Sequence, residues 1–419
     1  MGFQQGLSGL AAASKQLEVV GNNVANASTN GFKRSRSEFA DMYGSSLYGV
    51  SNAQAGIGVR TAEVSQLFDQ GNINSTGNNL DLAISGKGFF VLKSPSAASS
   101  QDAYSRNGAF QVDANGYLVN GDGYKLQGYA AQNGVIQYTA TPVDLQFQTS
   151  LISPTATSNV DLGVNLNSSA TVISPTPTVN PTDTSTYNSA TSVKVYDSLG
   201  NTHDLSFYFV KGTPTTTGTD WTVNLYVDGT AVTSPAGPQT LSFDTNGVLT
   251  SGGVLSNIQY TATTPNGSTT PMTIATVDLT KSTQFNSSFG VNSLAADGNA
   301  PGTLTSTNIN NQGIIEATYS NGKTVAIGQV ALANFTNVQG LQSMGGNLWK
   351  DVASSTGGAK VGAPMSADLG EIQSQALEQS NVDLNSELVD MIVAQRFYQA
   401  NAQSIKTEDT ILQTLINLR

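Results

Sequence analysis

Apolar residues recur at every seventh position near both ends of this 419-residue chain. Sustained heptads are typical of α-helices that pack against one another at a shallow crossing angle. We therefore predict an amphipathic helix over residues 3–27 and a second helix through the last part of the chain, with the two paired as a coiled coil. The N-terminal series comprises Phe3, Leu10, Leu17 and Val24, with Ala13 and Val20 at the second heptad position, and the C-terminal series comprises Leu377, Leu384, Met391, Tyr398, Ile405 and Leu412.

The C-terminal segment carries more apolar side chains than one partner helix can cover. Its other faces carry Val389, Val393, Phe397, Ile411 and Leu415. A two-helix hairpin buries one stripe of each helix, so the surplus is expected to be covered by other chains. An ordinary core within one chain is the alternative interpretation. The predicted assembly seam consists of Leu10, Leu17, Val20, Val24, Leu377, Leu384, Leu388, Met391, Tyr398, Ile405, Leu412 and Ile416.

Three glycines interrupt the N-terminal helix, at Gly6, Gly9 and Gly21. Each costs the helix up to about 1 kcal/mol relative to alanine. Such a helix is marginal in isolation and is expected to form when its apolar face finds a partner.

The composition argues against several classes of function. The net charge is −11, from 18 basic and 29 acidic residues, whereas binding to a nucleic-acid backbone needs clusters of Lys and Arg. The chain has no cysteine, and His203 is its one histidine, which excludes disulfides, thiolate sites and multi-histidine metal sites. Because no run of about 18 apolar residues occurs, we expect no membrane insertion.

No pattern of residues indicates an enzyme. His203 and Asp204 are neighbours in a predicted strand, where adjacent side chains point to opposite faces and cannot easily form an acid–base dyad. Gly86-Lys87-Gly88 lacks the preceding glycine and the following Ser or Thr of a phosphate-binding loop. We therefore predict no enzymatic activity, no catalytic residue, no cofactor and no metal site.

Between its ends the chain has the pattern of β-strands joined by turns. Phe89–Leu92 is a short apolar run, and apolar residues alternate with polar ones over Trp221–Val227. Asn115-Gly116 and Asn321-Gly322 stand between such runs, where Asn-Gly is a hairpin signal. Because no helical pattern separates the strands, we expect antiparallel sheets.

Changes in composition suggest how the chain is divided. Residues 150–190 are rich in Pro, Thr and Ser, which indicates a linker or edge loop. We infer a mixed, mainly β fold in which two antiparallel β domains are nested one inside the other and flanked by N- and C-terminal α-helices. The predicted parts are 1–30, the N-terminal helix, which forms a core domain with 375–419; 31–75, a junction segment; 76–148 and 292–365, an inner β domain; 149–291, an outer inserted β domain; and 366–419, a second junction followed by the C-terminal heptad helix.

Lys33-Arg34-Ser35-Arg36 is the one dense basic run in the chain. We interpret it as a solvated junction segment. A contact with acidic neighbours in an assembly is the alternative.

Several motifs resemble those of the flagellar rod and hook proteins. The N-terminal motif runs from Asn22 to Lys33. Its C-terminal counterparts are Ser380–Leu384, Glu387–Arg396 and Tyr398–Asn401. The likeness extends to Leu80–Phe90 and Tyr104–Phe110. Two further segments are similar to hook members in particular: Ser192–Asn201 and Val330–Phe335. The N-terminal motif includes Asn22, Asn23, Ala25, Asn26, Thr29, Gly31 and Phe32.

The resemblance implies a structural subunit of the bacterial flagellar hook, which polymerises into a curved, flexible tube and couples motor torque from the rod to the filament. The implied partners are further copies of the chain, the distal rod protein, the hook cap protein, the hook–filament junction proteins, the hook-length control protein and the flagellar type III export apparatus. The N-terminus lacks a basic leader and an unbroken apolar core. This agrees with export to the cell exterior without a cleaved signal peptide.

Three alternatives remain open. A distal rod protein of the same family would share both ends of the chain and would form straight, rigid assemblies. A secreted β-rich adhesin or carbohydrate-binding protein would need a concave aromatic site, for which Trp221 and Trp349 are the only tryptophans. A secreted hydrolase would need paired acids or a usable base.

Overall fold

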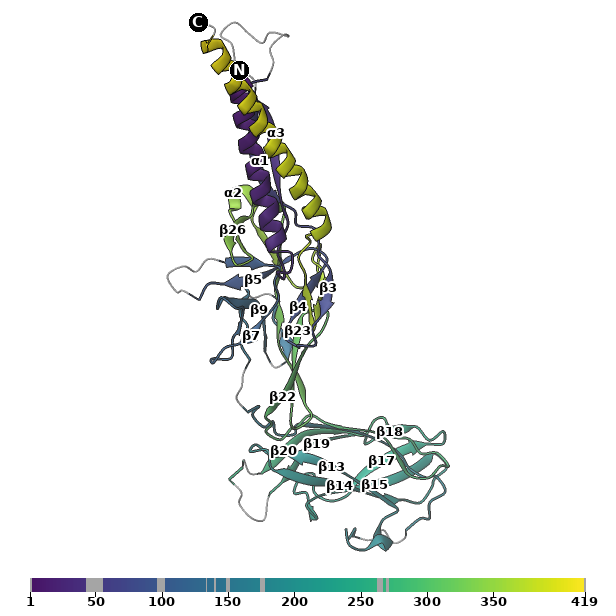
Figure 1. The fold of residues 1–419 in the computed structure, drawn as a ribbon. Helices are drawn as coiled ribbons and strands as arrows, with labels where there is room; N and C mark the ends of the chain where they lie inside the picture. The colour runs from purple at the N-terminus through teal and green to yellow at the C-terminus, as the bar shows by residue number, and fades with distance from the viewer. Residues whose placement is uncertain are drawn as a thin grey trace. The chain divides into compact units, whose positions relative to one another are not determined.

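The computed structural model describes residues 2–42, 56–95, 102–132, 134–138, 141–147, 151–173, 178–261, 267–268 and 271–417. The fold is mixed and mainly β, with long α-helices near both ends, which confirms the predicted fold class at this level (Figure 1). The chain divides into two compact units. Unit 1 comprises residues 1–148, 306–318 and 324–419, and unit 2 comprises residues 149–305 and 319–323.

Two long helices, α1 (Gly2–Ala25) and α3 (Leu384–Asn417), pack side by side in unit 1 (Figure 1). The start of α3 is capped by Asp383. Its Oδ1 accepts a hydrogen bond of 3.0 Å from the Asn385 amide, and its carbonyl accepts one of 3.0 Å from the Glu387 amide. An aspartate here satisfies an amide that would otherwise lack a partner. Among the described residues, the other helical segments are α2 (Ala353–Thr356) and the 3-10 turns Thr184–Thr186 and Val338–Gly340.

The predicted helical position of Leu377 is wrong. Leu377 lies in strand β30 (Ala376–Glu378), which pairs antiparallel with β3 (Ile73–Ser75), and its side chain is buried in unit 1. The helix therefore begins one heptad later, at Leu384. The seven-residue spacing of the helix continues to Leu377 by coincidence. Residues near Leu377 in sequence do not reveal the strand, because its partner, β3, lies far away in the sequence.

The apolar run of strand β5 (Phe89–Lys93) lies in the middle of unit 1 and is buried on both faces. Phe90 and Leu92 belong to one hydrophobic cluster, whereas Phe89 and Val91 belong to another. Because successive side chains of a strand point to opposite faces, a continuous apolar run is what a strand between two cores requires.

The largest sheet of the described chain has fourteen strands, and three two-stranded sheets accompany it: β1–β2, β4–β29 and β3–β30. The small sheets add β1 (Ser35–Met42), β2 (Gly58–Gln66), β4 (Leu82–Ser85) and β29 (Glu371–Ser374). The large sheet consists of β5, β6 (Asp102–Ser105), β7 (Gln111–Val112), β8 (Leu118–Val119), β9 (Lys125–Gln132), β10 (Val135–Ile136), β11 (Val143–Asp144), β22 (Leu304–Ile309), β23 (Ile314–Tyr319), β24 (Thr324–Val330), β25 (Leu332–Phe335), β26 (Gln342–Gly345), β27 (Leu348–Lys350) and β28 (Ala359–Gly362).

Unit 2 contains a four-stranded and a six-stranded sheet around one hydrophobic core. The predicted alternation is present, since the odd-numbered residues of Trp221–Val227 are buried in that core. The strands are β12 (Asn159–Asn165), β13 (Ser189–Tyr196), β14 (Thr202–Lys211), β15 (Gly218–Val227), β16 (Thr230–Ala231), β17 (Gln239–Asp244), β18 (Leu249–Ser251), β19 (Val254–Tyr260), β20 (Met272–Asp278) and β21 (Gly290–Ala296).

One strand pair in unit 2 corrects the prediction of purely antiparallel sheets. Strands β12 and β20 are parallel, with Val160 opposite Val277. A parallel pair needs a long connection, and here that connection contains the whole six-stranded sheet. The sequence analysis considered only connections between consecutive strands and therefore missed this pair.

Five hairpin turns share one five-residue pattern, in which Asp or Asn comes first and Gly fourth. In each turn the first side chain accepts hydrogen bonds from the amides two and four residues later. The glycines have φ between 72° and 85°, a conformation that costs glycine little. The turns start at Asp113, Asn120, Asp197, Asp244 and Asn310.

Candidate assembly interface

Helix α1 carries a glycine at two of its contacts with α3. A Cβ atom on Gly6 would lie 2.9 Å from Cγ1 of Ile405, and one on Gly9 would lie 2.7 Å from Oδ1 of Asn401. Neither distance leaves room for a side chain unless α3 or its side chains move. Ala394, on the same side of α3, is completely buried. Small residues therefore let the two helices approach closely at this part of their contact.

The predicted seam residues differ in how far they are buried in the single chain. Leu377 is outside the helix, and Val20 is buried. Half-buried members are Leu10, Leu17, Val24, Met391 and Ile405, and exposed members are Leu384, Leu388, Tyr398, Leu412 and Ile416. Only some of the large apolar residues at the heptad positions are therefore covered in the single chain.

Gly6, Gly9 and Ala394 were not predicted as contact residues, because the heptad pattern concerns large apolar side chains. In a closely packed helix pair, small residues let the backbones approach. The available signal was a second heptad line on the C-terminal helix, formed by Glu387, Ala394 and Asn401, which carries small or polar residues only.

A band of large apolar side chains on α3 faces solvent in the single chain. Exposed fractions are 60% for Val389, 52% for Ile392, 56% for Phe397 and 51% for Ile411. Leu388 is 43% exposed. Exposed apolar surface of this kind marks a site of protein–protein contact, so we call the band formed by these five residues the α3 apolar face.

Asn23 of the N-terminal motif joins three segments at the base of the helices. Its Nδ2 donates to the Ser35 carbonyl (2.8 Å) and to Oε2 of Glu387 (3.2 Å), and its Oδ1 accepts from the Ser35 amide (2.9 Å). Arg34 Nε lies 2.6 Å from Oε1 of the same Glu387. These contacts connect the last turn of α1, the start of β1 and the first turn of α3.

Other residues of the N-terminal motif shape the end of α1. The Asn26 side chain donates to the Asn22 carbonyl (2.9 Å), and the Thr29 hydroxyl donates to Oδ1 of Asn26 (3.3 Å). The Phe32 amide donates to the Thr29 carbonyl (3.3 Å). Ala25 is exposed at the last helical position. These bonds turn the chain out of the helix and towards the β-strands.

Gly31 is required by both its conformation and its surroundings. Its φ is +70°, and a Cβ atom there would lie 2.5 Å from the backbone nitrogen of Asn107. Its amide donates to the Glu378 carbonyl (2.8 Å). The segment after α1 therefore lies against the loop after β6 at Asn107 and is bonded to β30 at Glu378.

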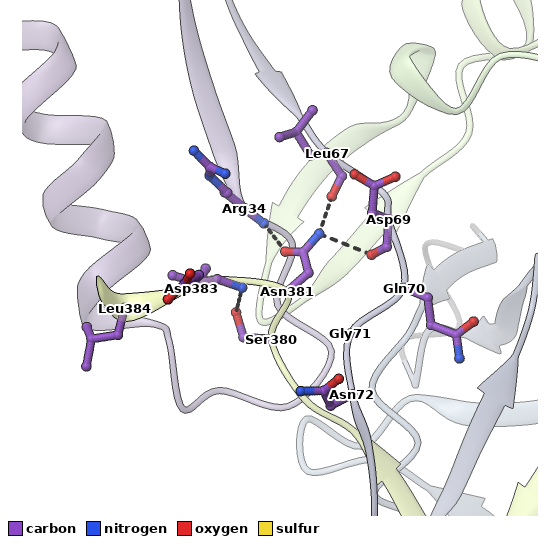
Figure 2. A pocket seen from close by; sticks show the side chains of 11 residues that line it. Arg34, Leu67, Asp69, Gln70, Gly71, Asn72, Ser380, Asn381, Asp383 and Leu384 are labelled. Atoms are coloured by element: carbon purple, nitrogen blue, oxygen red, sulfur yellow. Dashed lines mark hydrogen bonds between the residues drawn. The ribbon is translucent and has the colours of Figure 1, made fainter. Parts of the chain in front are cut away.

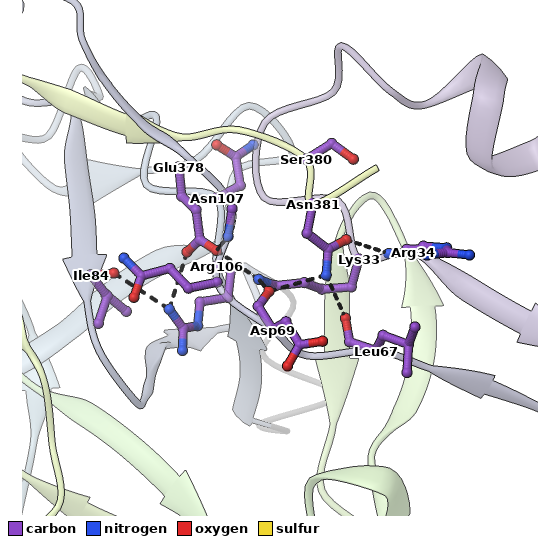
Figure 3. A network of polar contacts seen from close by, with 12 residues as sticks. Lys33, Arg34, Leu67, Asp69, Ile84, Arg106, Asn107, Glu378, Ser380 and Asn381 are labelled. Carbon is purple, nitrogen blue, oxygen red and sulfur yellow. Dashed lines mark hydrogen bonds and ion pairs between the residues drawn. The ribbon is translucent and has the colours of Figure 1, made fainter. Parts of the chain in front are cut away.

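Three buried charges meet among the segments that connect the helices to the strands of unit 1 (Figure 3). Lys33 Nζ lies 2.6 Å from Oε1 of Glu378, and Arg106 Nη1 lies 3.1 Å from its Oε2. The side chains of Lys33 and Glu378 are fully buried, and that of Arg106 is 5% exposed. We call these three residues the junction triad. The interpretation of the basic run as a solvated segment is therefore wrong for Lys33, whose acidic partner belongs to the same chain.

Most of the remaining polar atoms of the triad are also partnered, and the buried Nε of Arg106 is the exception. Lys33 donates to the Asp69 carbonyl (2.7 Å), Gly71 donates its amide to Glu378 (2.9 Å), and Arg106 donates to the Gly86 carbonyl (2.8 Å). Burial lowers the pKa of both Lys33 and Arg106, and the Glu378 carboxylate opposes that effect. Two cations sharing one buried carboxylate leave an excess positive charge, so the carboxylate is essential to the arrangement.

An open pocket of about 450 Å³ lies beside the triad, at the base of α3 (Figure 2). Asn381 spans it: Oδ1 accepts from the Arg34 amide (2.7 Å), and Nδ2 donates to the carbonyls of Leu67 (2.8 Å) and Asp69 (3.1 Å). The pocket adjoins Leu384, the first residue of α3. These bonds from the Asn381 side chain to the backbone hold the segment before α3 in place.

His203 does not pair with its neighbour Asp204. Its Nδ1 lies 2.6 Å from Oδ2 of Asp228, and its Nε2 lies 3.5 Å from Oδ2 of Asp197. The histidine thus connects the turn before β14 to the end of β15.

The described residues contain neither a membrane-spanning helix nor a group of metal ligands. No helix among them has both the length and the apolar character needed to cross a membrane. Within the same residues, no three or more His, Asp or Glu side chains are grouped as a metal site requires.

Family models match most of the chain. The flagella basal body rod protein model matches residues 3–33, and the flagellar basal body rod FlgEFG protein C-terminal model matches 373–418. The flagellar hook protein FlgE/F/G D1 domain model matches 83–174, and the flagellar basal body protein FlaE D2 domain model matches 165–299. The helices, the junction and the β units together therefore define a protein of the flagellar rod and hook class.

Full-length relatives narrow this class. Flagellar hook protein FlgE of Salmonella typhimurium is 42% identical over 426 residues, and that of Escherichia coli is 41% identical over 424, each alignment covering 100% of both chains. FlgE of Borreliella burgdorferi is 33% identical, covering 99% of this chain and 98% of the relative. The chain belongs to the flagellar hook protein FlgE family.

A solved structure shares the fold. The crystal structure of Helicobacter pylori flagellar hook protein FlgE2 aligns with a TM-score of 0.54 at 15% identity, covering 73% of this chain and 100% of that one. At this identity the likeness concerns the fold alone.

Proposed function

We propose that this chain is the structural subunit of a bacterial flagellar hook, and that copies of it polymerise into a curved, flexible tube that couples motor torque from the rod to the filament. The observation that carries the proposal is the α3 apolar face. Val389 and Phe397 are more than half exposed although α3 already packs on α1. Burying such surface contributes roughly 25 cal/mol per Å², and a second copy of the chain would supply the cover.

We assign the parts of the chain to layers of this tube. The paired helices, which we propose form a coiled coil, would line the channel, the inner β domain (76–148 and 292–365) would form the wall, and the outer domain (149–291) would lie at the surface. The polar composition of the outer part supports this order. Exchanging one exposed hydrogen bond for another changes the free energy little, so contacts there can slide when the tube bends.

The proposed partners are further copies of the chain first, and then those of a hook: the distal rod protein, the hook cap, hook–filament junction and hook-length control proteins, and the flagellar type III export apparatus. The proposed location is the hook outside the cell, reached without cleavage of a signal peptide. FlgE relatives are structural proteins, and we propose no catalytic role for this chain.

The nearest rival is a distal rod protein of the same family. It would assemble into straight, rigid tubes, whereas a hook subunit forms supercoiled ones. Electron micrographs of polymers grown from purified protein distinguish the two. An adhesin or carbohydrate-binding protein would form no tubes and would be retained on a glycan column.

Leu388→Asp tests the proposal at the α3 apolar face. Losing the burial of one leucine costs about 2 kcal/mol, which corresponds to more than a tenfold rise in the concentration needed for assembly. The melting temperature of the β units should not change, because Leu388 lies on a helix surface and is 43% exposed. Sedimentation and electron microscopy measure assembly, and calorimetry measures melting.

The matched control is Gln111→Asp, which places the same charge at an exposed polar position of β7, outside the α3 apolar face, and should leave assembly near the wild-type level. Tubes formed by Leu388→Asp at the wild-type concentration would count against the proposed interface. A large drop in its melting temperature would instead place Leu388 in a core.

A further inference from the structure

The junction triad lies where both helix connections enter the β part of unit 1. Lys33 follows the end of α1 by eight residues, and Glu378 precedes the start of α3 by six. Arg106 directly follows strand β6 and is held by the carbonyls of Ile84 (3.5 Å) and Gly86 (2.8 Å). Each charge thus belongs to a different segment, and the single carboxylate is the point at which the three segments meet (Figure 3).

A burial-only account does not explain these charges. Replacing a buried ion pair by apolar residues of similar size is often neutral or stabilising, so the triad is weak evidence for added stability. What the charged groups add is a defined relative orientation of the three segments, because each hydrogen bond constrains both a distance and an angle. An apolar cluster would hold the same segments together and would tolerate rotation between them.

Neighbouring contacts extend the same directional constraint upwards. Asn23 bonds to Ser35 and Glu387, and Asn381 accepts from the Arg34 amide. The last turn of α1 and the first turn of α3 are therefore both tied to residues within a few positions of the triad. A rotation of the helices against the sheets would break charge-assisted bonds that water cannot replace in a buried site.

We propose that the junction triad fixes the direction in which the α1–α3 pair leaves the β part of unit 1, and that Glu378 is the positioning residue. Its role is orientation, and assembly itself depends on the α3 apolar face. The consequence for the shape of the tube rests on the proposed function. A fixed exit direction removes one source of variation between subunits, so the curvature should be uniform from tube to tube.

The test measures a distance between α1 and the large sheet of unit 1 in the free, full-length chain. The protein has no cysteine, so Ser14→Cys on α1 and Gln111→Cys on β7, both at exposed positions, provide two unique attachment sites for spin labels. Pulsed electron–electron double resonance then gives the distribution of distances between the two spin labels. We expect one narrow peak for the otherwise unchanged chain.

Three further variants separate orientation from stability. Glu378→Gln leaves two buried cations without a counter-charge and should lower the melting temperature and broaden the distance distribution. Lys33→Met keeps the Arg106–Glu378 pair and should have the smaller effect on both. The triple variant Lys33→Met/Arg106→Met/Glu378→Leu should melt at or above the wild-type temperature and still give a distance distribution at least twice as broad.

A narrow, wild-type distribution in the stable triple variant would overturn the proposal, because an apolar junction would then orient the helices equally well. So would a folded triple variant that cannot form tubes, since the triad would then be needed for assembly itself. Tubes of the triple variant should form and vary in curvature. If the wild-type chain forms no tubes, the proposed function fails, while the distance measurement still decides the role of the triad.

Discussion

Asp197 shows how a single side chain closes a turn in this fold. Its carboxylate accepts hydrogen bonds from the amides of Leu199 (2.9 Å) and Asn201 (2.8 Å) and from the Asn201 side chain (2.8 Å). Burial alone would raise the pKa of Asp197, but the hydrogen bonds from Asn201 and Leu199 outweigh burial and hold the pKa well below its usual range. The ionised form therefore stabilises the folded chain.

Asp197 should make the stability of unit 2 depend on acid. An aspartate whose pKa is depressed on folding contributes stability above its unfolded pKa of about 3.9, and this contribution is lost as the pH falls through the folded pKa. We expect Asp197→Asn to lower the urea midpoint of unit 2 at pH 7 and to have a smaller effect at pH 3. Fluorescence of Trp221, read in a Trp349→Phe background, reports this midpoint. An equal loss at both pH values would contradict the assignment.

Pairings between distant residues mark the limit of what single residues reveal in a sequence. The basic run at Lys33 was visible, but its partner Glu378 is 345 residues away. A local pattern carries no information about such a partner, and a lysine is almost never buried unless paired. Asn-Gly turns were found where the dipeptide occurs, whereas the fuller pattern begins with Asp or Asn three residues before the glycine.

At the level of elements, the pairing of α1 with α3 depends on what α1 lacks. Gly6 and Gly9 face Ile405 and Asn401 of α3, whereas a Cβ atom on Gly21 would meet no atom within 4 Å. The three glycines cost the isolated helix about the same free energy. Two of them repay that cost through close contact with the partner helix, and the third does not.

The same substitution at two of these glycines should have opposite effects. Gly9→Leu forces a side chain into the contact with Asn401, and overpacking of this kind costs about 1–3 kcal/mol. Gly21→Leu should stabilise α1 by up to about 1 kcal/mol through helix propensity. Thermal melts followed by far-ultraviolet circular dichroism measure the helical signal, which should fall at lower temperature for Gly9→Leu alone. Equal melts for both variants would place the helix contact elsewhere.

The existence of the long helices followed from heptads, and the position of their contact did not. Leu384, Met391, Tyr398, Ile405 and Leu412 lie in α3 as predicted. Periodicity identifies a helix with an apolar stripe, but the stripe here is shared between a partner helix and solvent. Which part faces α1 depends on the small residues of both helices, and their shapes matter only once the two are paired.

At the level of the whole molecule, the chain carries one internal reporter in each unit. Trp221 is buried in the core of unit 2, and Trp349 is buried in unit 1, where its Nε1 donates to Oε1 of Gln66 (2.7 Å). These are the two tryptophans of the sequence. Single-tryptophan variants therefore follow the unfolding of each unit separately.

Gly247→Ala should destabilise unit 2 without affecting unit 1. Gly247 has φ of +78°, and a Cβ atom there would lie 2.3 Å from the Gln284 carbonyl oxygen, so strain and collision together should cost about 1–3 kcal/mol. Gly229→Ala is the matched control, because Gly229 has φ of +77° and open space around a Cβ, and it should cost less. Urea unfolding followed at Trp221 should shift for Gly247→Ala, while the Trp349 signal should not. A joint shift of both signals would mean that the units unfold together.

The mainly β class and the helical ends were within reach of sequence reasoning, since both rest on local patterns. The parallel pairing of β12 with β20 was not, because it joins strands separated by more than a hundred residues. The short return of the chain to unit 2 at 319–323 was equally out of reach. Segment 319–323 belongs to unit 2 although the residues on both sides of it belong to unit 1.

This division has a practical meaning for anyone who builds chimeras by grafting unit 2 from a relative. Exchanging residues 149–305 alone would leave the hairpin tip 319–323 behind. In that tip the Asn321 side chain donates to the Ala300 carbonyl (2.6 Å), and Lys323 Nζ donates to Oδ1 of Asn299 (2.9 Å). A transplant that keeps the donor's own five-residue tip preserves both bonds, and one that omits it joins two surfaces that were never selected to fit.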